Sequence, residues 1–386
     1  MNSYERVQAT LAHKEPDRIP FDLGSTLQTG MNIKTYRRLR EYLGMPAVRD
    51  NIINMDQQLA QIDDDMIDRL KVDVRAIEPK PPLNRGCSTD VSRDGESYRF
   101  RDEWGIDWRM PIVGGHYYNL ENSPLDEAET LEDMSGYRWP DAVDPGRFAT
   151  MQEQAERYLK IEKRACVLGR LGAGVLEIAL WLNGYEKFFC DMLSNERYAQ
   201  DILEKITDLK LQYWGKTLDA VGENVMIAME GDDLGTQSSL LISSELYNRM
   251  VRPCHKRIFD FIHSRAKAPV SVFFHSCGAV KSLIPGFIED GVDILNPVQI
   301  NAQGMDPIAL KKEFGRDVTF WGGGIDTQII LPNASPEKIR DEVRRTIEIL
   351  APGGGFVFTP VHNVQSDVPV KNYMAMWEAL QEYGAY

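Results

Sequence analysis

The pattern of hydrophobic and polar positions alternates between two periods in the C-terminal two thirds of this chain. Short apolar runs rich in β-branched and aromatic residues predict buried strands, and longer segments with apolar residues every three to four positions predict amphipathic helices. The strands are expected at residues 165–172, 224–230, 270–275, 293–299, 317–322 and 355–362. The helices are expected up to about residue 184 and at 195–221, 244–266, 280–290, 306–314, 335–350 and 370–383. Repeated strand–helix units of this kind indicate a parallel sheet.

The N-terminal part adds a helix near residues 3–13, a loop entering a first strand at 16–24 and a second strand at 70–77. With the later units this matches the strand number of a (β/α)8 barrel. A doubly wound sheet is the alternative, but no G-x-G-x-x-G motif lies between a strand and a helix. Residues 98–108 alternate around a glycine and predict a β-hairpin. We expect one barrel domain over 1–386 with an insertion at about 83–145.

Composition narrows the class of protein. The 386 residues are 43% hydrophobic and 26% charged, as in globular proteins, and the net charge is −14 with dispersed Lys and Arg. We therefore predict no nucleic-acid partner. No stretch approaches the roughly 20 apolar residues of a membrane span, and the first residues lack a signal-peptide pattern, so we expect a cytoplasmic protein without membrane association. Five scattered cysteines predict no disulfide framework.

The apolar run at 270–275 ends in His275-Ser276-Cys277-Gly278. Residues i and i+2 of an extended segment point to the same side, so the imidazole and the thiol can converge on one point. Together these groups suit a zinc ion. The alternative is a core cysteine beside a hydrogen-bonded histidine, because two ligands alone do not make a metal site. The spacing favours a shared third atom over a Cys–His nucleophile pair.

Glu230 is the expected companion of His275 and Cys277. It ends the strand that precedes theirs, and consecutive strands of a barrel are neighbours. We predict its carboxylate as a third metal ligand or as a general base in catalysis. Asp232 and Asp233, which follow it, are candidates to orient the metal ligands.

Further polar residues follow the last two predicted strands, at the face where a barrel enzyme holds its substrate. Asp326 and Gln328 come after a triple glycine that lets the backbone approach a ligand, although a tight turn would use the same residues. His362 and Asn363 end the last strand and either bind substrate or brace the barrel. We predict these four residues as substrate-binding.

Four segments together resemble the uroporphyrinogen decarboxylase superfamily. They are residues 6–20 (RVQATLAHKEPDRIP), the His275-Ser276-Cys277-Gly278 strand end, residues 322–328 (GGGIDTQ) and residues 356–363 (FVFTPVHN). The resemblance extends over nearly the whole chain and implies a (β/α)8 fold. One branch of the superfamily decarboxylates uroporphyrinogen without a cofactor, and another contains corrinoid-dependent zinc methyltransferases.

The chain departs from both branches at identifiable positions. The decarboxylases grip substrate carboxylates with an Arg-Gln-Ala-Gly-Arg loop, whereas residues 24–32 read GSTLQTGMN and contain no arginine. Asp73, by contrast, resembles their catalytic aspartate. The methyltransferases use a His-x-Cys motif, matched by His275 and Cys277, and a distant cysteine that would fall within 324–328, where this chain has none.

The resemblance therefore implies a zinc site of His275, Cys277 and Glu230, like that of methyltransferases that demethylate methyl ethers such as methoxyaromatics. In these O-demethylases the metal polarises the ether oxygen, and the methyl group passes to a corrinoid (cobalamin) on a separate protein. We expect an enzyme of this kind, with Zn²⁺, a partner corrinoid protein and a small methyl donor or acceptor. A cofactor-free decarboxylase and a non-enzymatic ligand-binding barrel are the alternatives.

Overall fold

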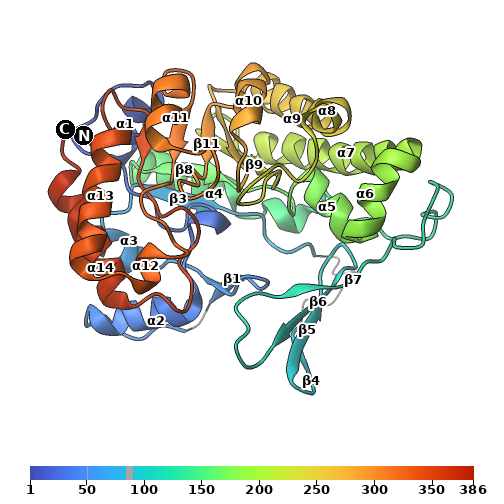
Figure 1. Ribbon diagram of the computed structural model, residues 1–386, viewed down its shortest axis with the longest axis horizontal. Helices are drawn as coiled ribbons and strands as arrows, with labels where there is room; N and C mark the ends of the chain where they lie inside the picture. Colours follow the sequence, from blue (N-terminus) through green and yellow to red (C-terminus); the bar gives the residue numbers. More distant parts are fainter. Residues whose placement is uncertain (50, 84–89) are drawn as a thin grey trace.

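The centre of the computed structural model, which describes residues 1–49, 51–83 and 90–386, is a parallel sheet (Figure 1). Its strands lie side by side in chain order, from β3 to β13. They are β3 (Val74–Ile77), β8 (Ala165–Leu168), β9 (Ile227–Gly231), β10 (Ser271–His275), β11 (Ile294–Asn296), β12 (Thr319–Trp321) and β13 (Phe356–Val357). A doubly wound sheet would reverse its order at a switch point, so the uninterrupted order rules that alternative out.

The segment around Phe21 closes the ring between the two edge strands. Phe21 pairs in parallel with Phe358, and the Asp22 N–H donates to the Phe358 carbonyl at 3.0 Å. On the other side the Asp73 N–H donates to the Phe21 carbonyl at 2.8 Å. The predicted (β/α)8 barrel is thus confirmed. Its first position is an extended segment with few ladder bonds, since Pro20 has no N–H to contribute.

Successive side chains of a strand point to opposite faces of the sheet, so every second residue has the same parity. The side chains of one parity fill the inside of the barrel. Phe273 of β10 and Trp321 of β12 are fully buried there with rings 5.5 Å apart. The other members of this inner cluster come from nearly every strand and from the first helix: Val7, Val74, Ala165, Val167, Met226, Ile227, Met229, Ile294 and Val357. The opposite parity faces the helices, as Phe274 does against Phe259 and Phe287. Which parity a polar residue has therefore decides whether it can face the barrel axis.

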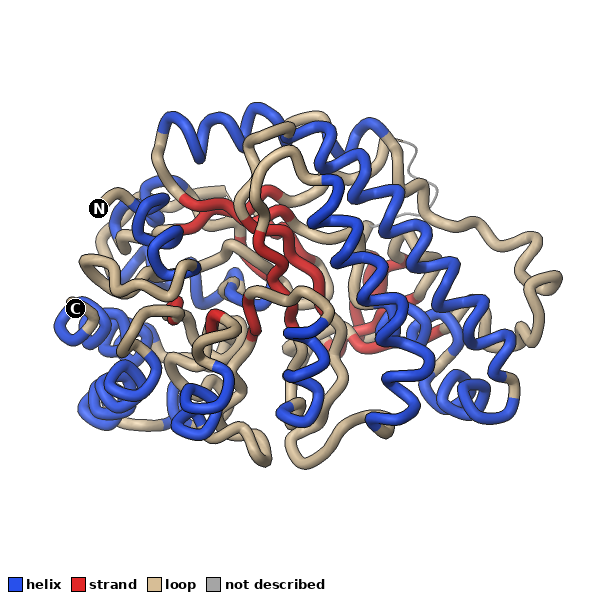
Figure 2. Tube along the Cα trace, turned by 90° about the horizontal axis from the view of Figure 1, so that it is seen from above, coloured by secondary structure: helices blue, strands red, loops and turns tan. Residues whose placement is uncertain are grey.

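Helices cover the outside of the sheet (Figure 2). They are α1 (Ser3–Leu11), α2 (Ile33–Tyr42), α3 (Asp64–Arg69), α4 (Met151–Glu156), α5 (Val175–Asn183), α6 (Tyr185–Ser194), α7 (Glu196–Val221), α8 (Ser244–Leu246), α9 (Arg252–Arg265), α10 (Ile284–Glu289), α11 (Pro307–Phe314), α12 (Ile330–Asn333), α13 (Pro336–Leu350) and α14 (Val370–Tyr383). The predicted helix at 244–266 is interrupted by a π-helical turn before α9, where Pro253 removes a backbone donor. None of the described helices combines the length and apolar character that a membrane crossing requires.

A small antiparallel sheet lies within the predicted insertion. It consists of β4 (Ser92–Asp94), β5 (Ser97–Arg101), β6 (Asp107–Pro111) and β7 (Asn119–Asn122), and it projects on the side of α5 and α6 (Figure 1). The predicted hairpin is β5–β6, with Gly105 at a φ of 73° in its turn. Trp108 packs edge-on against Trp181 of α5, with ring centroids 5.1 Å apart. Residues 84–89 of the predicted insertion lie outside the described residues, and the single-domain organisation stays a prediction. A separate pair, β1 (Ile52–Asn54) and β2 (Leu59–Ala60), lies nearby in the chain.

Candidate metal centre

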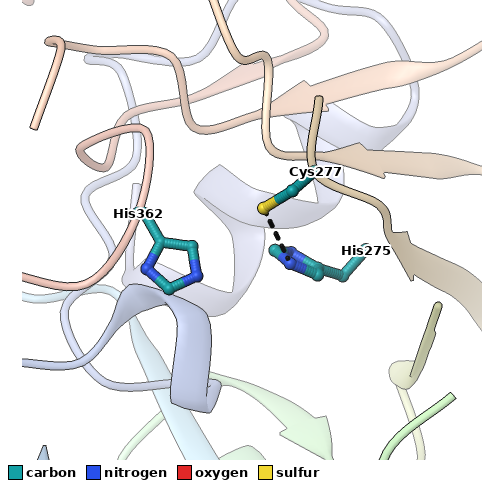
Figure 3. Close-up of side chains that lie close together, drawn as sticks. All are labelled: His275, Cys277 and His362. Carbon is teal, nitrogen blue, oxygen red and sulfur yellow. Dashed lines mark hydrogen bonds between the residues drawn. The ribbon is translucent and has the colours of Figure 1, made fainter. Parts of the chain in front are cut away.

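His275, Cys277 and His362 come together at the carboxyl end of the barrel strands. His275 ends β10, Cys277 follows it, and His362 lies in the loop after β13 (Figure 3). One ligand atom from each residue lies within 4.8 Å of the other two, and Cys277 Sγ is 3.4 Å from His275 Nε2. The fold thus joins the two ligands expected from the His-x-Cys motif to a third donor, His362, which we had assigned to substrate binding.

Two imidazole nitrogens and one thiolate sulfur are a donor set that suits zinc. Zinc–nitrogen and zinc–sulfur bonds of about 2.0–2.3 Å place the ligand atoms of one ion roughly 3.5 Å apart. The Cys277 Sγ–His275 Nε2 distance of 3.4 Å already matches that spacing. Burial, and the nearby His275, lower the pKa of His362 to about 4, so its ring is neutral at pH 7 and keeps a lone pair for a metal. The residues present therefore fit a zinc ion.

Asn296 orients His275. Its Nδ2 donates to the Trp321 carbonyl at 2.7 Å, which leaves its Oδ1 to accept from His275 Nδ1 at 2.5 Å. His275 Nδ1 therefore carries the proton, and Nε2 presents its lone pair toward Cys277. A hydrogen-bonded outer partner of this kind fixes the tautomer and the ring orientation of a metal-binding histidine.

Asp233 lies against both motif residues. Its Oδ1 accepts the Cys277 N–H at 2.9 Å and is 3.4 Å from His275 Nε2. Burial alone would raise the pKa of this carboxyl, but the hydrogen bond and charge of His275 in its doubly protonated form outweigh burial and lower the pKa. In the neutral tautomer, which leaves Nε2 for a metal, His275 does not supply this charge. Burial and the Asp233 charge raise the pKa of the Cys277 thiol, an effect that a bound cation reverses. Asp233 thus contacts both motif residues, and its role as an orienting residue stays a prediction.

The structure corrects the expected role of Glu230. In the register of β9 and β10, Glu230 is opposite Phe274 and Gly231 is opposite His275, so Glu230 has the outward parity. Its Oε2 accepts from Lys210 Nζ at 2.9 Å and its Oε1 from Trp214 Nε1 at 2.7 Å, both on α7. The group of candidate ligands among the described residues does not include it. Glu230 is a buried ion-pair partner in the barrel wall.

Asp73 is also corrected as a catalytic candidate. It precedes β3, at the opposite end of the barrel from His275, and is fully buried. Its carboxylate accepts from Arg6 Nη1 at 2.7 Å, from Arg18 Nη1 at 2.8 Å and from the Phe21 N–H at 2.8 Å. This network ties α1 and the first barrel segment to β3, which is a structural role.

The four predicted substrate residues divide into two pairs. Asp326 accepts the backbone N–H groups of Gln328 and Ile329, so it caps a turn, and the exposed Gln328 accepts from Gln237. Neither lines the cavity described below. His362 lines it, and Asn363 is buried behind it and accepts from the Tyr117 hydroxyl at 3.3 Å.

A cavity of about 820 Å³ opens onto His275, His362 and Asp233. The barrel and the inserted sheet both contribute to its walls, including Glu78, Arg170 and Glu177. Burial raises the pKa of Glu78 to about 7, and burial together with the charge of Asp233 raises that of Glu177 to about 8. Sequence reasoning missed Glu78, although it directly follows the last apolar residue of β3, which is the expected position of a site residue in a barrel.

Replacing Asn296 with alanine is expected to weaken zinc binding by about 10- to 100-fold, because His275 loses the acceptor that fixes its tautomer. Competition with a chromophoric chelator measures the affinity. Asn301→Ala is the matched control, since Asn301 bonds to Asp326 and Gln328 instead. An unchanged affinity in Asn296→Ala would contradict the assigned orienting role.

Comparisons with known proteins agree with this architecture. The profile of the uroporphyrinogen decarboxylase (URO-D) family matches residues 116–383. A methylated-thiol–coenzyme M methyltransferase of Methanosarcina mazei is 21% identical over 310 residues, which cover 76% of this chain and 75% of that protein. A uroporphyrinogen decarboxylase of Mannheimia succiniciproducens is 24% identical over 197 residues, half of each chain. The solved structure of a methyltransferase from Methanosarcina mazei aligns with a TM-score of 0.61 at 16% identity over 99% of both chains, which supports the fold. The chain therefore belongs to the uroporphyrinogen decarboxylase family.

Proposed function

We propose that this protein is a zinc-dependent methyltransferase that moves a methyl group between a small methylated donor and a separate corrinoid protein. The observation that carries the proposal is the group of His275, Cys277 and His362 at the mouth of the barrel, whose two histidines line a cavity of about 820 Å³. The methyltransferase activity named for the Methanosarcina mazei relative supports the type of reaction.

Zinc held by these three residues would supply Lewis acidity, which favours negative charge on an oxygen or sulfur atom. Asn296 holds His275 in the ligating tautomer, and Asp233 holds the backbone of Cys277. In such a transfer the bonding electron pair would stay on the donor's oxygen or sulfur, and a reduced corrinoid on the partner would supply the electron pair of the new bond to the methyl carbon.

The donor set favours an ether oxygen over a thiolate. Two neutral imidazoles and one thiolate leave a net positive charge on Zn²⁺, whereas a second thiolate would cancel it. A more electrophilic metal suits the polarisation of oxygen. The cavity volume and its aromatic walls suit a ring-containing donor, so a methoxyaromatic ether is the kind of substrate we propose.

A decarboxylase acting on uroporphyrinogen is less well supported. Such an enzyme needs several cations to hold a polycarboxylate tetrapyrrole. Arg170 is the one arginine among the described residues that line the cavity, and no lysine lines it. Asp73, which matches the decarboxylase aspartate in sequence, lies in an ion-pair network outside the cavity.

Two measurements on the purified protein test the proposal. Elemental analysis is expected to find about one zinc per chain. Single-turnover assays with a reduced corrinoid protein and a panel of methyl ethers and methyl thioethers are expected to show methylation of the corrinoid, lost on chelation and restored by zinc. Absence of both zinc and methyl transfer across the panel would overturn the proposal.

A further inference from the structure

The cavity beside His275 and His362 is strongly acidic. The described carboxylates that line it are Asp56, Glu78, Asp102, Glu103, Glu177 and Asp233. Two of them are already satisfied, because Glu103 pairs with Arg147 and Asp102 accepts from two backbone N–H groups and the Trp108 indole. Asp233 and Asp56 also have partners, since Asp233 accepts the Cys277 N–H and Asp56 accepts from Asn54 and Gln57. Glu78 and Glu177 remain, with Arg170 as the lining guanidinium.

Arg170 does not neutralise its surroundings. Its Nη1 donates to the Gly231 carbonyl, and its Nη2 lies 3.7 Å from Glu177 Oε2. No hydrogen-bond donor among the described residues contacts the Glu78 carboxylate. The positive charge of Arg170 attracts this carboxylate and partly offsets the effect of burial on its pKa. One guanidinium cannot balance both carboxylates when both are ionised, so the cavity holds acidic groups that a cationic ligand can ionise. Burial raises the pKa of both groups, and a cation in the cavity would favour their ionised forms.

Aromatic faces alternate with these carboxylates. Glu177 and Trp181 are one helical turn apart on α5, which places carboxylate and indole on the same side. The inserted sheet and its connecting loops supply further rings to the lining: Phe100, Trp104, Trp108, Tyr117 and Tyr118. The indole N–H of Trp104, a side chain that is 4% exposed, has no hydrogen-bond partner among the described residues, so a lining group retains unmet bonding capacity. Aromatic rings combined with carboxylates are the surroundings that bind ammonium groups.

We propose that the methyl donor is cationic: a methyl ether or thioether whose other end carries an ammonium or quaternary ammonium group, held by Glu78, Glu177 and Trp181. This inference rests on the proposed methyl transfer at the metal centre. It adds the chemical nature of the donor's other end, which does not react, and the residues that bind it. Anionic donors such as methoxybenzoates are disfavoured, because a donor carboxylate would lie beside Glu78 and Glu177 and oppose their ionisation.

Three probes that share a para-methoxyphenyl ring test the charge preference. They carry trimethylammonium, the neutral isostere tert-butyl, or carboxylate, and calorimetric titration into the zinc-loaded protein without corrinoid measures binding without turnover. The ammonium probe is expected to bind about tenfold or more tighter than the tert-butyl probe, and the carboxylate probe weaker than both.

Variants localise the effect. Glu78→Gln is expected to lower the affinity for the ammonium probe about five- to tenfold and to leave the affinity for the tert-butyl probe unchanged. Glu186→Gln, exposed on α6, is the matched control and is expected to change neither. Trp181→Leu keeps an apolar wall and is expected to weaken the ammonium probe selectively, which provides a second test if Glu78→Gln folds poorly.

Equal binding of the ammonium and tert-butyl probes, or tighter binding of the carboxylate probe, would overturn the inference. Selective ammonium binding in a protein that transfers no methyl group would support this inference and overturn the proposed function. Methyl transfer from neutral or anionic donors without a charge preference would support the proposed function and overturn this inference.

Discussion

Replacing His362 with alanine is expected to reduce the zinc content from about one per chain to background and to lower methyl transfer on the order of 10²–10³-fold. His275→Ala and Cys277→Ser are expected to have the same effect. The reason is that the three donor atoms lie within 4.8 Å of one another, and removal of any one leaves two ligands, too few for a zinc site. Elemental analysis and single-turnover assays on the same preparations measure both effects.

Two variants control this prediction. His263→Ala changes a partly exposed histidine on α9 that bonds to the Gly291 carbonyl, and it is expected to keep zinc. Glu230→Gln is also expected to keep zinc, because its oxygens bond to Lys210 and Trp214. Loss of zinc from Glu230→Gln, in protein shown to be folded, together with retention in His362→Ala would reverse the ligand assignment.

Replacing Asp73 with alanine is expected to lower the free energy of unfolding by about 3–5 kcal/mol, the range for a broken buried ion pair. The carboxylate is fully buried, and its removal leaves the Arg6 and Arg18 guanidinium groups and the Phe21 N–H without their shared acceptor. Urea unfolding followed by circular dichroism measures the change. Zinc content and methyl transfer by the folded fraction are expected to stay near the unsubstituted values.

Asp68→Ala is the matched control. Asp68 also pairs with an arginine, Arg164, but its side chain is 71% exposed, so the expected loss is about 0–1 kcal/mol. If Asp73→Ala unfolds like the unsubstituted protein and loses methyl transfer, then Asp73 takes part in the chemistry, as its resemblance to the decarboxylase aspartate suggested.

Hydrophobic periodicity was sufficient to predict most of the barrel. The strands of the C-terminal two thirds and the long helices α7, α9, α13 and α14 have apolar residues at the period of their own secondary structure. The helices missed were α2, α3, α4, α6 and α12. Both α3 and α4 are only six residues long, too short for a helical period to stand out.

The assignment of Glu230 shows where sequence reasoning stopped. Its position at the end of the strand before His275 was read correctly, but adjacent strands bring together residues of equal parity. The register places Gly231, not Glu230, beside His275. The sequence would have given the parity of Glu230 only if the first and last residues of the strand had been known. An error of one residue in these bounds moves every side chain to the other face.

The sequence by itself determined the barrel, the His-x-Cys pair and the location of the site at the strand ends, because periodicity and i, i+2 geometry are properties of a few consecutive residues. Only the tertiary structure brought His362 beside that pair, held Glu230 and Asp73 in ion pairs, and gathered carboxylates and aromatic rings around one cavity. These features depend on ring closure and on an inserted sheet packed against α5. Both bring together residues that are distant in the chain, and no local pattern encodes their contact.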